Sequence, residues 1–116
     1  MFNNILLAYD GSEHAQNALK VAAGLAKTHV ATLHLVHTPQ VDTPPIVIGS
    51  YVSMLEVPPS KEDIEKAGTF IKDMAIAEAK AEGVELASTH ILAGPPARNI
   101  LDTAETTNAD LIVMGR

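Results

Sequence analysis

The spacing of hydrophobic residues changes period several times along the chain. Residues 5–9 form a short continuous apolar run that ends at Asp10 and Gly11. Such a run is typical of a strand buried on both faces and followed by a turn. In the next stretch apolar residues recur three and four positions apart, which predicts one face of a helix. Ser12 is a preferred N-cap for that helix, and Glu13 suits its electropositive first turn.

These two periods continue through the rest of the chain, apart from one long interruption. Short apolar stretches predict strands, and apolar residues at helical spacing predict helices. The further elements expected are a strand at residues 30–37, a helix capped by Ser60 and ended by Gly83, a strand at 84–92, a helix that begins at Pro95 or Pro96, and a strand at 109–114. This alternation predicts an α/β fold, a doubly wound parallel sheet with helices on both faces.

Residues 38–59 form the interruption and hold five of the seven prolines in the chain. A connection of this length is uncommon in a compact domain and is usually functional or partly structured. Apolar residues at 46–48 and 51–52 indicate that its middle packs on something. Because the segment leaves the carboxyl end of the second strand, we expect it to cover a ligand pocket or to contact a neighbouring subunit.

The chain ends at Arg116, directly after the strand predicted at residues 109–114. That strand is almost wholly apolar, which is typical of burial on both faces. A domain rarely ends on its most buried strand without a helix to cover it. We therefore expect residues 1–116 to form a single domain that is incomplete at its C-terminus.

Composition narrows the classes of function. The 116 residues carry 8 basic and 14 acidic side chains, a net charge of -6, which argues against a general nucleic-acid binder. A small anionic ligand stays compatible, because backbone N–H groups can hold a phosphate on an acidic protein. The absence of cysteine excludes disulfides and thiol chemistry. With neither a long apolar segment nor a basic leader, we expect no membrane insertion and a cytoplasmic location.

A ligand site is expected where the first and fourth strands end. Open parallel sheets bind ligands at the carboxyl ends of strands, beside the reversal of strand order. Asp10 supplies a carboxylate for sugar hydroxyls, and Gly11 and Gly115 allow close approach of the backbone. Ser12 begins a helix whose free N–H groups favour anions. The alternative is that Asp-Gly-Ser is an ordinary turn with a helix cap.

Standard catalytic and nucleotide fingerprints are absent. The chain has no G-x-G-x-x-G after its first strand, no P-loop, and no G-x-S-x-G around a serine. The five histidines lack metal-ligand spacing, and His34 and His37 lie three apart on one strand and so point to opposite faces. We expect exposed or hydrogen-bonded histidines and no metal, and we expect Arg98 to be a surface residue.

Four segments, in order and at matching spacing, resemble the universal stress protein family. They are residues 5–12 (ILLAYDGS), 33–36 (LHLV), 94–100 (GPPARNI) and 109–115 (ADLIVMG). The resemblance covers essentially the whole chain. It implies a Rossmann-like or flavodoxin-like sandwich with strand order 3-2-1-4-5, of which the last helix and the fifth strand would follow Arg116. It also implies a homodimer or higher homo-oligomer.

The family includes members that bind ATP. The resemblance therefore implies ATP as the ligand here, with Mg²⁺ as a companion ion of its phosphates. In these members the fourth strand is followed by G-x-x-G, nine residues and G-[ST], of which this chain has only Gly115. The resemblance implies that Asp10 meets the ribose or adenine and that Val36 hydrogen-bonds the adenine through its backbone. The residues implied as nucleotide-binding are Ala8, Tyr9, Asp10, Gly11, Val36, Met114 and Gly115.

The expected function is that of an adenine-nucleotide-binding stress-response regulator. Nothing in the sequence supplies a general base, so we expect no enzyme activity beyond weak ATP hydrolysis. A dimeric interaction module of the same family that binds no nucleotide is the alternative. A related group of adenine-nucleotide hydrolases is a weaker one, because those enzymes carry an S-G-G-x-D-S loop where this chain has Asp10, Gly11, Ser12 and Glu13.

Overall fold

The computed structural model describes residues 2–39, 47–48, 51–52 and 61–115 of the chain. Every strand and helix expected from the two periods is present, with ends that shift by up to a few residues. In chain order the elements are β1 (Asn4–Ala8), α1 (Glu13–His29), β2 (Thr32–His37), β3 (Val47–Ile48), β4 (Tyr51–Val52), α2 (Lys61–Ala81), β5 (Leu86–Ile91), α3 (Pro96–Thr107) and β6 (Leu111–Met114).

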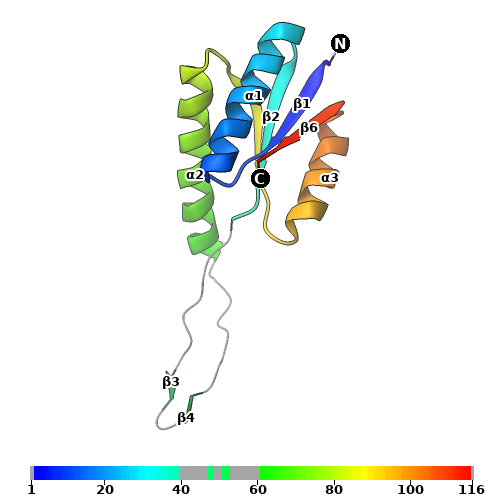
Figure 1. The fold of residues 1–116 in the computed structure, drawn as a ribbon. Coiled ribbons are helices and arrows are strands. Elements are labelled where there is room, and N and C mark those ends of the chain that lie inside the picture. Colours follow the sequence, from blue (N-terminus) through cyan, green and yellow to red (C-terminus); the bar gives the residue numbers. More distant parts are fainter. Residues whose placement is uncertain (1, 40–46, 49–50, 53–60, 116) are drawn as a thin grey trace.

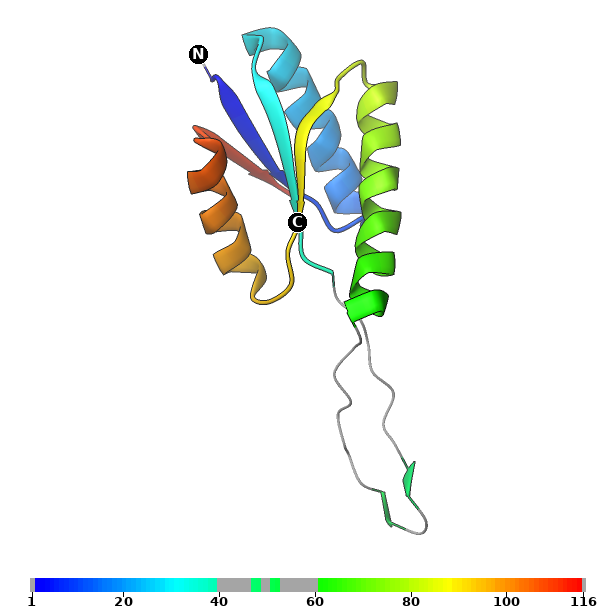
Figure 2. The ribbon, with the colours of Figure 1, turned by 180° about the vertical axis from the view of Figure 1, so that it is seen from behind.

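Four strands form one parallel sheet in the order β5-β2-β1-β6. Counted along the predicted strands this is the order 3-2-1-4, so the fold expected from the sequence is confirmed. Figures 1 and 2 show α1 and α2 on one side of the sheet and α3 on the other. The chain runs outward from β1 to β5 and then returns to add β6 on the other side of β1, so the strand order reverses at β1.

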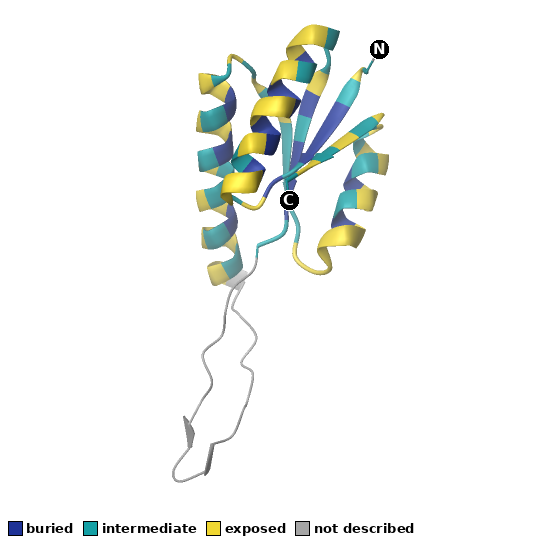
Figure 3. Cartoon of the chain, viewed as in Figure 1, coloured by how far each residue is buried: buried dark blue, intermediate teal, exposed yellow. Residues whose placement is uncertain are grey.

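The core is built around β1. Ile5, Leu6 and Leu7 are fully buried, because β1 has a strand on each side and helices on both faces. The face of α1 that meets the sheet is rich in alanine, which lets the helix backbone pack close to the strands. Figure 3 shows the buried residues on β1, β2 and the inward faces of the helices, with exposed residues outside.

The ends of the helices follow local rules that the sequence predicted. The Ser12 hydroxyl accepts the Ala15 N–H at 3.2 Å, so Ser12 is the N-cap of α1. Gly83 follows α2 with a φ of +81°, and the next N–H donates to the Ala79 carbonyl at 2.9 Å. This pair of features is a Schellman motif, as expected. Ser60 lies outside the described residues.

Val30 departs from the prediction. The sequence placed it in a strand at residues 30–37, but it ends α1 in the left-handed region with a φ of 52°. The N–H of Ala31 then donates to the Ala26 carbonyl at 2.8 Å, which gives α1 the same type of end as α2. The valine side chain is 86% exposed. The hydrogen bonds of the helix end therefore override the β-propensity of valine.

β6 is also less buried than its apolar sequence predicted. Ile112 and Met114 are 36% and 61% exposed. In the described part of the chain β6 pairs only with β1, and α3 packs on β1 and β2. β6 is therefore the edge strand among the described residues, and because the strand expected beside it would follow Arg116, its burial on both faces stays a prediction.

Most of the proline-rich segment 38–59 lies outside the described residues. Within it β3 and β4 form an antiparallel pair, with Val47 opposite Val52 and Ile48 opposite Tyr51. The sequence did not predict this pair. The expectation that the segment covers a pocket or contacts another subunit stays a prediction.

A chain of polar side chains crosses the sheet on the face opposite α1 and α2. His34 on β2 lies between two partners, with its Nδ1 2.6 Å from the Ser88 hydroxyl and its Nε2 3.3 Å from Oδ1 of Asn4. The Ser88 hydroxyl is also 2.9 Å from Nε2 of His90. Neutral rings satisfy every contact if His90 donates to Ser88, Ser88 donates to His34, and His34 donates to Asn4. These two histidines are hydrogen-bonded, as expected.

Replacing Val30 with glycine should stabilise the protein. A β-branched residue at positive φ is strained, and glycine adopts this conformation freely. We expect the free energy of unfolding to rise by about 0.5–1 kcal/mol, as strain relief exceeds the entropic penalty of glycine. Urea unfolding measures the change. Val21→Gly, inside α1 and also exposed, is the matched control and should destabilise. A Val30→Gly protein that unfolds at lower urea than wild type would contradict the strain argument.

Stability should also depend on the protonation of His34. Burial, followed by the neighbouring charge of His90, lowers the pKa of His34 from its ordinary value of 6.5. The folded state therefore binds this proton more weakly than the unfolded chain. The contribution of neutral His34 to the free energy of unfolding is fully present above pH 6.5. It is lost as the pH falls through that value toward the lower pKa of the folded state.

Urea unfolding at a series of pH values tests this dependence. His34→Gln should flatten the loss of stability between about pH 7 and pH 5. His14→Gln, at an exposed position in the first turn of α1, should leave the wild-type profile in place. Equal profiles for the wild type and His34→Gln would show that His34 does not carry the effect.

Candidate functional site

A cleft of about 550 Å³ lies at the carboxyl ends of the sheet strands. Figure 1 shows these ends converging near the C-terminus, next to the loop that follows β1. The cleft is bounded by the ends of β1, β2 and β6, by α2, and by the first turns of α1 and α3. Its lining residues are Ala8, Tyr9, Asp10, Ala15, Val36, His37, Thr38, Ala67, Phe70, Ile71, Pro96, Ile100, Met114 and Gly115.

The structure brings six of the seven predicted site residues together in this cleft. They are Ala8, Tyr9, Asp10, Val36, Met114 and Gly115. Gly11 does not line it. Its φ is +82°, and a Cβ there would lie 2.7 Å from Cδ1 of Ile71, so Gly11 serves the turn and its packing on α2. The grouping is a property of the fold, while nucleotide binding by these residues stays a prediction.

Asp10 is exposed at the start of the loop after β1. Its Oδ1 accepts the Ser12 N–H at 2.9 Å. Hydrogen bonding from the Ser12 side chain, helped by the backbone and by the charge of His37, holds the pKa of Asp10 below its usual value. The turn-and-cap interpretation is therefore correct for its local bonds. It does not use up the carboxylate, which can accept about four hydrogen bonds.

Tyr9 contributes its backbone to the cleft rather than a free phenol. Its ring is buried in the core, and its hydroxyl donates to Oε2 of Glu78 on α2 at 2.8 Å. Burial first, and then the bond to Glu78, raise the pKa of Tyr9. The Tyr9 N–H donates to the Val36 carbonyl at 3.0 Å. The Val36 backbone, which the resemblance assigned to adenine binding, thus already has one lone pair of its carbonyl engaged.

His37 is a cleft residue that the sequence analysis did not assign to the site. Its ring is buried, and its Nδ1 lies 2.7 Å from the Tyr9 carbonyl oxygen. Because a carbonyl only accepts, Nδ1 carries a hydrogen and Nε2 is the acceptor of the neutral ring. The signal that could have found His37 is its place as the last residue of a central strand.

Asn99 fixes the wall that α3 provides. It is buried, and its Nδ2 lies 2.9 Å from Oγ1 of Thr38, 3.0 Å from the Leu92 carbonyl and 3.2 Å from the Ala93 carbonyl. Its two hydrogens thus join the first turn of α3 to the ends of β2 and β5. This turn begins at Pro96, in the helical position where a missing N–H is tolerated.

The electrostatics of the cleft come from the backbone more than from basic side chains. Neither lysine nor arginine is among its lining residues. The first turns of α1 and α3 border it, and helix N-termini attract anions. Arg98 is exposed and paired with Asp102 at 3.4 Å, away from the lining, as expected of a surface residue. In the described residues no group of three metal-ligating side chains gathers, and none of the described helices is long and apolar enough to span a membrane.

Comparison with known proteins gives one family. The model of the universal stress protein family matches residues 1–116. A universal stress protein of Thermus aquaticus, named for the 3′ region of a QAH/OAS sulfhydrylase, is 40% identical over 116 residues, which cover 99% of this chain and 77% of that protein. A solved protein of the same family from Burkholderia pseudomallei is 31% identical, with a TM-score of 0.66, over 98% of this chain and 81% of the other.

More distant solved structures share the fold and were determined with nucleotides. The Archaeoglobus fulgidus universal stress protein in complex with dAMP has a TM-score of 0.67 at 20% identity, over 98% of this chain and 80% of that one. An Arabidopsis thaliana family protein with AMP bound has a TM-score of 0.63 at 16% identity, over 98% and 76%. At these identities the likeness shows the fold alone.

Adding a methyl group at Gly115 should damage the site. A Cβ there would lie 2.6 Å from the carbonyl carbon and oxygen of His14 and 2.7 Å from the Ala15 nitrogen. Backbone atoms cannot move aside as a flexible side chain can. We expect Gly115→Ala to lower the free energy of unfolding by about 1–3 kcal/mol, as in other overpacked positions.

Gly24→Ala is the matched control for thermal or urea unfolding of Gly115→Ala. Gly24 lies inside α1, and a Cβ there would meet no atom within 4 Å. Alanine should raise stability there by about 0.8–1 kcal/mol. If both alanine variants were as stable as wild type or more so, the close approach of β6 to α1 would be wrong.

Proposed function

The chain belongs to the universal stress protein family, and we propose that it is a regulator whose cleft binds an adenine nucleotide. The observation that carries the proposal is the meeting of six predicted site residues in one cleft at the strand-order reversal. The volume of about 550 Å³ lies in the range of small-molecule sites. The solved relatives with dAMP and AMP support the choice of nucleotide.

The lining divides into parts that suit a nucleoside. Ala8, Val36 and Met114 give apolar surface for the base. Asp10 is held in its charged form, so its carboxylate is a strong acceptor for ribose hydroxyls. This combination of apolar walls with a few placed polar groups is typical of ligand pockets.

Phosphates would be held mainly by backbone N–H groups. The cleft lining has neither lysine nor arginine, but the start of α1 and the start of α3 border it. Gly115 places backbone next to the first turn of α1, where a phosphate would lie. The specific ligand proposed is ATP. The lining holds one carboxylate, Asp10, so Mg²⁺ would enter on the phosphates rather than in a protein cage.

We propose binding with little or no hydrolysis. Asp10, with its lowered pKa, is a weak proton acceptor, and Tyr9, with its raised pKa, stays protonated and bonded to Glu78. Nε2 of His37 is the remaining proton acceptor, and the lining holds no lysine or arginine that could stabilise a phosphoryl group during transfer. The bound nucleotide would act by stabilising one conformation or assembly of the protein. A cytoplasmic location and a homodimer or higher oligomer are parts of this proposal.

A dimeric interaction module without a nucleotide is the second candidate. The exposed apolar side chains of β6 and α3 favour it, because Ile112, Met114 and Leu101 are 36%, 61% and 63% exposed. The two candidates make opposite predictions for nucleotide binding.

Calorimetric titration with ATP and AMP, with and without Mg²⁺, tests the proposal together with mass analysis of any nucleotide released from the purified protein. Asp10→Asn keeps an oxygen for the Ser12 N–H but removes the charge. We expect it to weaken nucleotide affinity about tenfold or more, the loss of a hydrogen bond to a charged group. Asp102→Ala, an exposed acid outside the cleft, should leave affinity unchanged. No heat of binding and no released nucleotide would reject the proposal in favour of the interaction module.

A further inference from the structure

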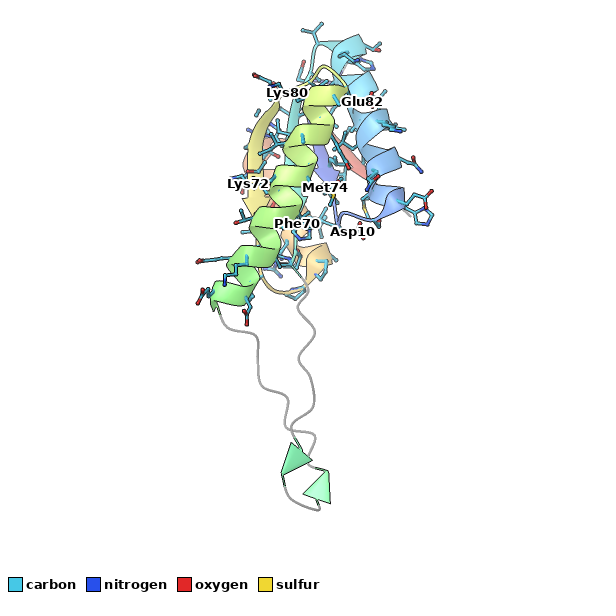
Figure 4. The ribbon with its side chains drawn as sticks, turned by 90° about the vertical axis from the view of Figure 1, so that its left-hand side faces the viewer. Asp10, Phe70, Lys72, Met74, Lys80 and Glu82 are labelled. Atoms are coloured by element: carbon cyan, nitrogen blue, oxygen red, sulfur yellow. The ribbon has the colours of Figure 1, made fainter. Side chains whose placement is uncertain are left out.

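Phe70 is an exposed aromatic side chain at the wall of the cleft. It lies on α2, is 66% exposed, and lines the cleft beside its helix neighbours Ala67 and Ile71. It is one of only two phenylalanines in the chain, and the other, Phe2, packs against the core. Figure 4 shows Phe70 on α2 at the same level as Asp10 on the loop after β1.

The position of Phe70 is fixed by the packing around it. Ile71, the next residue, reaches the loop after β1, where its Cδ1 would lie 2.7 Å from a Cβ at Gly11. Sδ of Met74, about one turn further along α2, would lie 3.9 Å from the same Cβ position. Gly68 allows α2 to lie against β5, because a Cβ there would clash with the side chain of Ile91. α2 is thus held against the sheet at the height of the cleft, which places the backbone of Phe70 at the cleft wall.

α3 and the end of β6 contribute aliphatic side chains to the cleft. Pro96 and Ile100 come from α3, and Met114 comes from the end of β6. Phe70 is the one lining residue that offers an exposed aromatic ring, since the ring of Tyr9 is buried in the core. A planar base gains affinity by stacking on an aromatic side chain. A ribose phosphate has no such face to offer.

We propose that Phe70 is a specificity-determining residue of the cleft, which stacks on the base of the bound nucleotide. This inference rests on the proposed function and adds α2 as a wall of the site, a part that the sequence resemblance did not include. Stacking selects an aromatic base over a bare sugar phosphate. It distinguishes bases from one another only weakly, because every base has a π-face.

The absence of tryptophan in the chain makes a direct optical test available. Phe70→Trp places a single tryptophan at the proposed stacking position. Ile76→Trp places it on the same helix at a 42% exposed residue outside the lining. Each variant is titrated with adenosine, AMP and ribose 5-phosphate. We expect saturable quenching of the Phe70→Trp emission by adenosine and AMP, little change with ribose 5-phosphate, and no change in the Ile76→Trp protein.

Calorimetric titration of variants without tryptophan provides a second test of stacking. Phe70→Ala should weaken AMP affinity about tenfold, and Phe70→Tyr, which keeps the ring, should retain it. Affinity for ribose 5-phosphate should be equal in all three proteins. Because the side chain is mostly exposed, the unfolding midpoint of Phe70→Ala should stay close to that of wild type, which separates a contact with the base from a role in folding.

The outcomes separate the two proposals. If the wild type binds AMP while Phe70→Ala binds it equally well and Phe70→Trp is not quenched, stacking is wrong and nucleotide binding stands. If the wild type binds neither adenosine nor AMP, the proposed function fails and the inference fails with it. Quenching of Phe70→Trp by ribose 5-phosphate as strong as that by AMP would also overturn stacking, because it would report a conformational change without a base.

Discussion

The enclosure of β1 is the constraint on which the rest of the structure depends. Its three central residues, Ile5, Leu6 and Leu7, are fully buried between two parallel neighbours and two helical layers. Parallel pairing brings the carboxyl ends of β2, β1 and β6 to one edge. The loop after β1 must then emerge between the other two strand ends. The cleft is a consequence of this topology before any side chain in it is considered.

Close approaches of the backbone give the cleft its shape. Gly115 lets the end of β6 lie against the first turn of α1, and Gly11 lets the loop after β1 lie on Ile71 of α2. Asn99 fixes α3 in the same way, because its side-chain amide donates hydrogen bonds to residues at the ends of β2 and β5. Each wall is therefore fixed by a small number of polar or steric contacts, and Asp10, whose pKa is lowered, is part of the cleft lining.

Local patterns predicted the fold and the two loops where the cleft lies because both follow from strand ends and period changes, and the family resemblance added Val36. Ser12 and Gly83 were recognisable as cap residues from their neighbours alone. Val30 was not, since its left-handed conformation is imposed by the hydrogen bonds of the preceding helix end. His37 could have been found as the last residue of a central strand, whereas the positions of Asn99 and Phe70 depend on packing between elements that are distant in the sequence. No periodicity encodes these relations.

The central claim is that the cleft at the strand-order reversal is a nucleotide site. At 12.3 kDa the chain is well suited to a titration of its ¹⁵N-labelled backbone amides with AMP, followed by NMR. We expect saturable shifts confined to the residues around the cleft, at positions 8–12, 36–38 and 114–115 and on the facing turn of α2, with the far ends of the strands unchanged. Saturable shifts at the β6 edge and α3 alone, or no shifts at millimolar AMP, would contradict it.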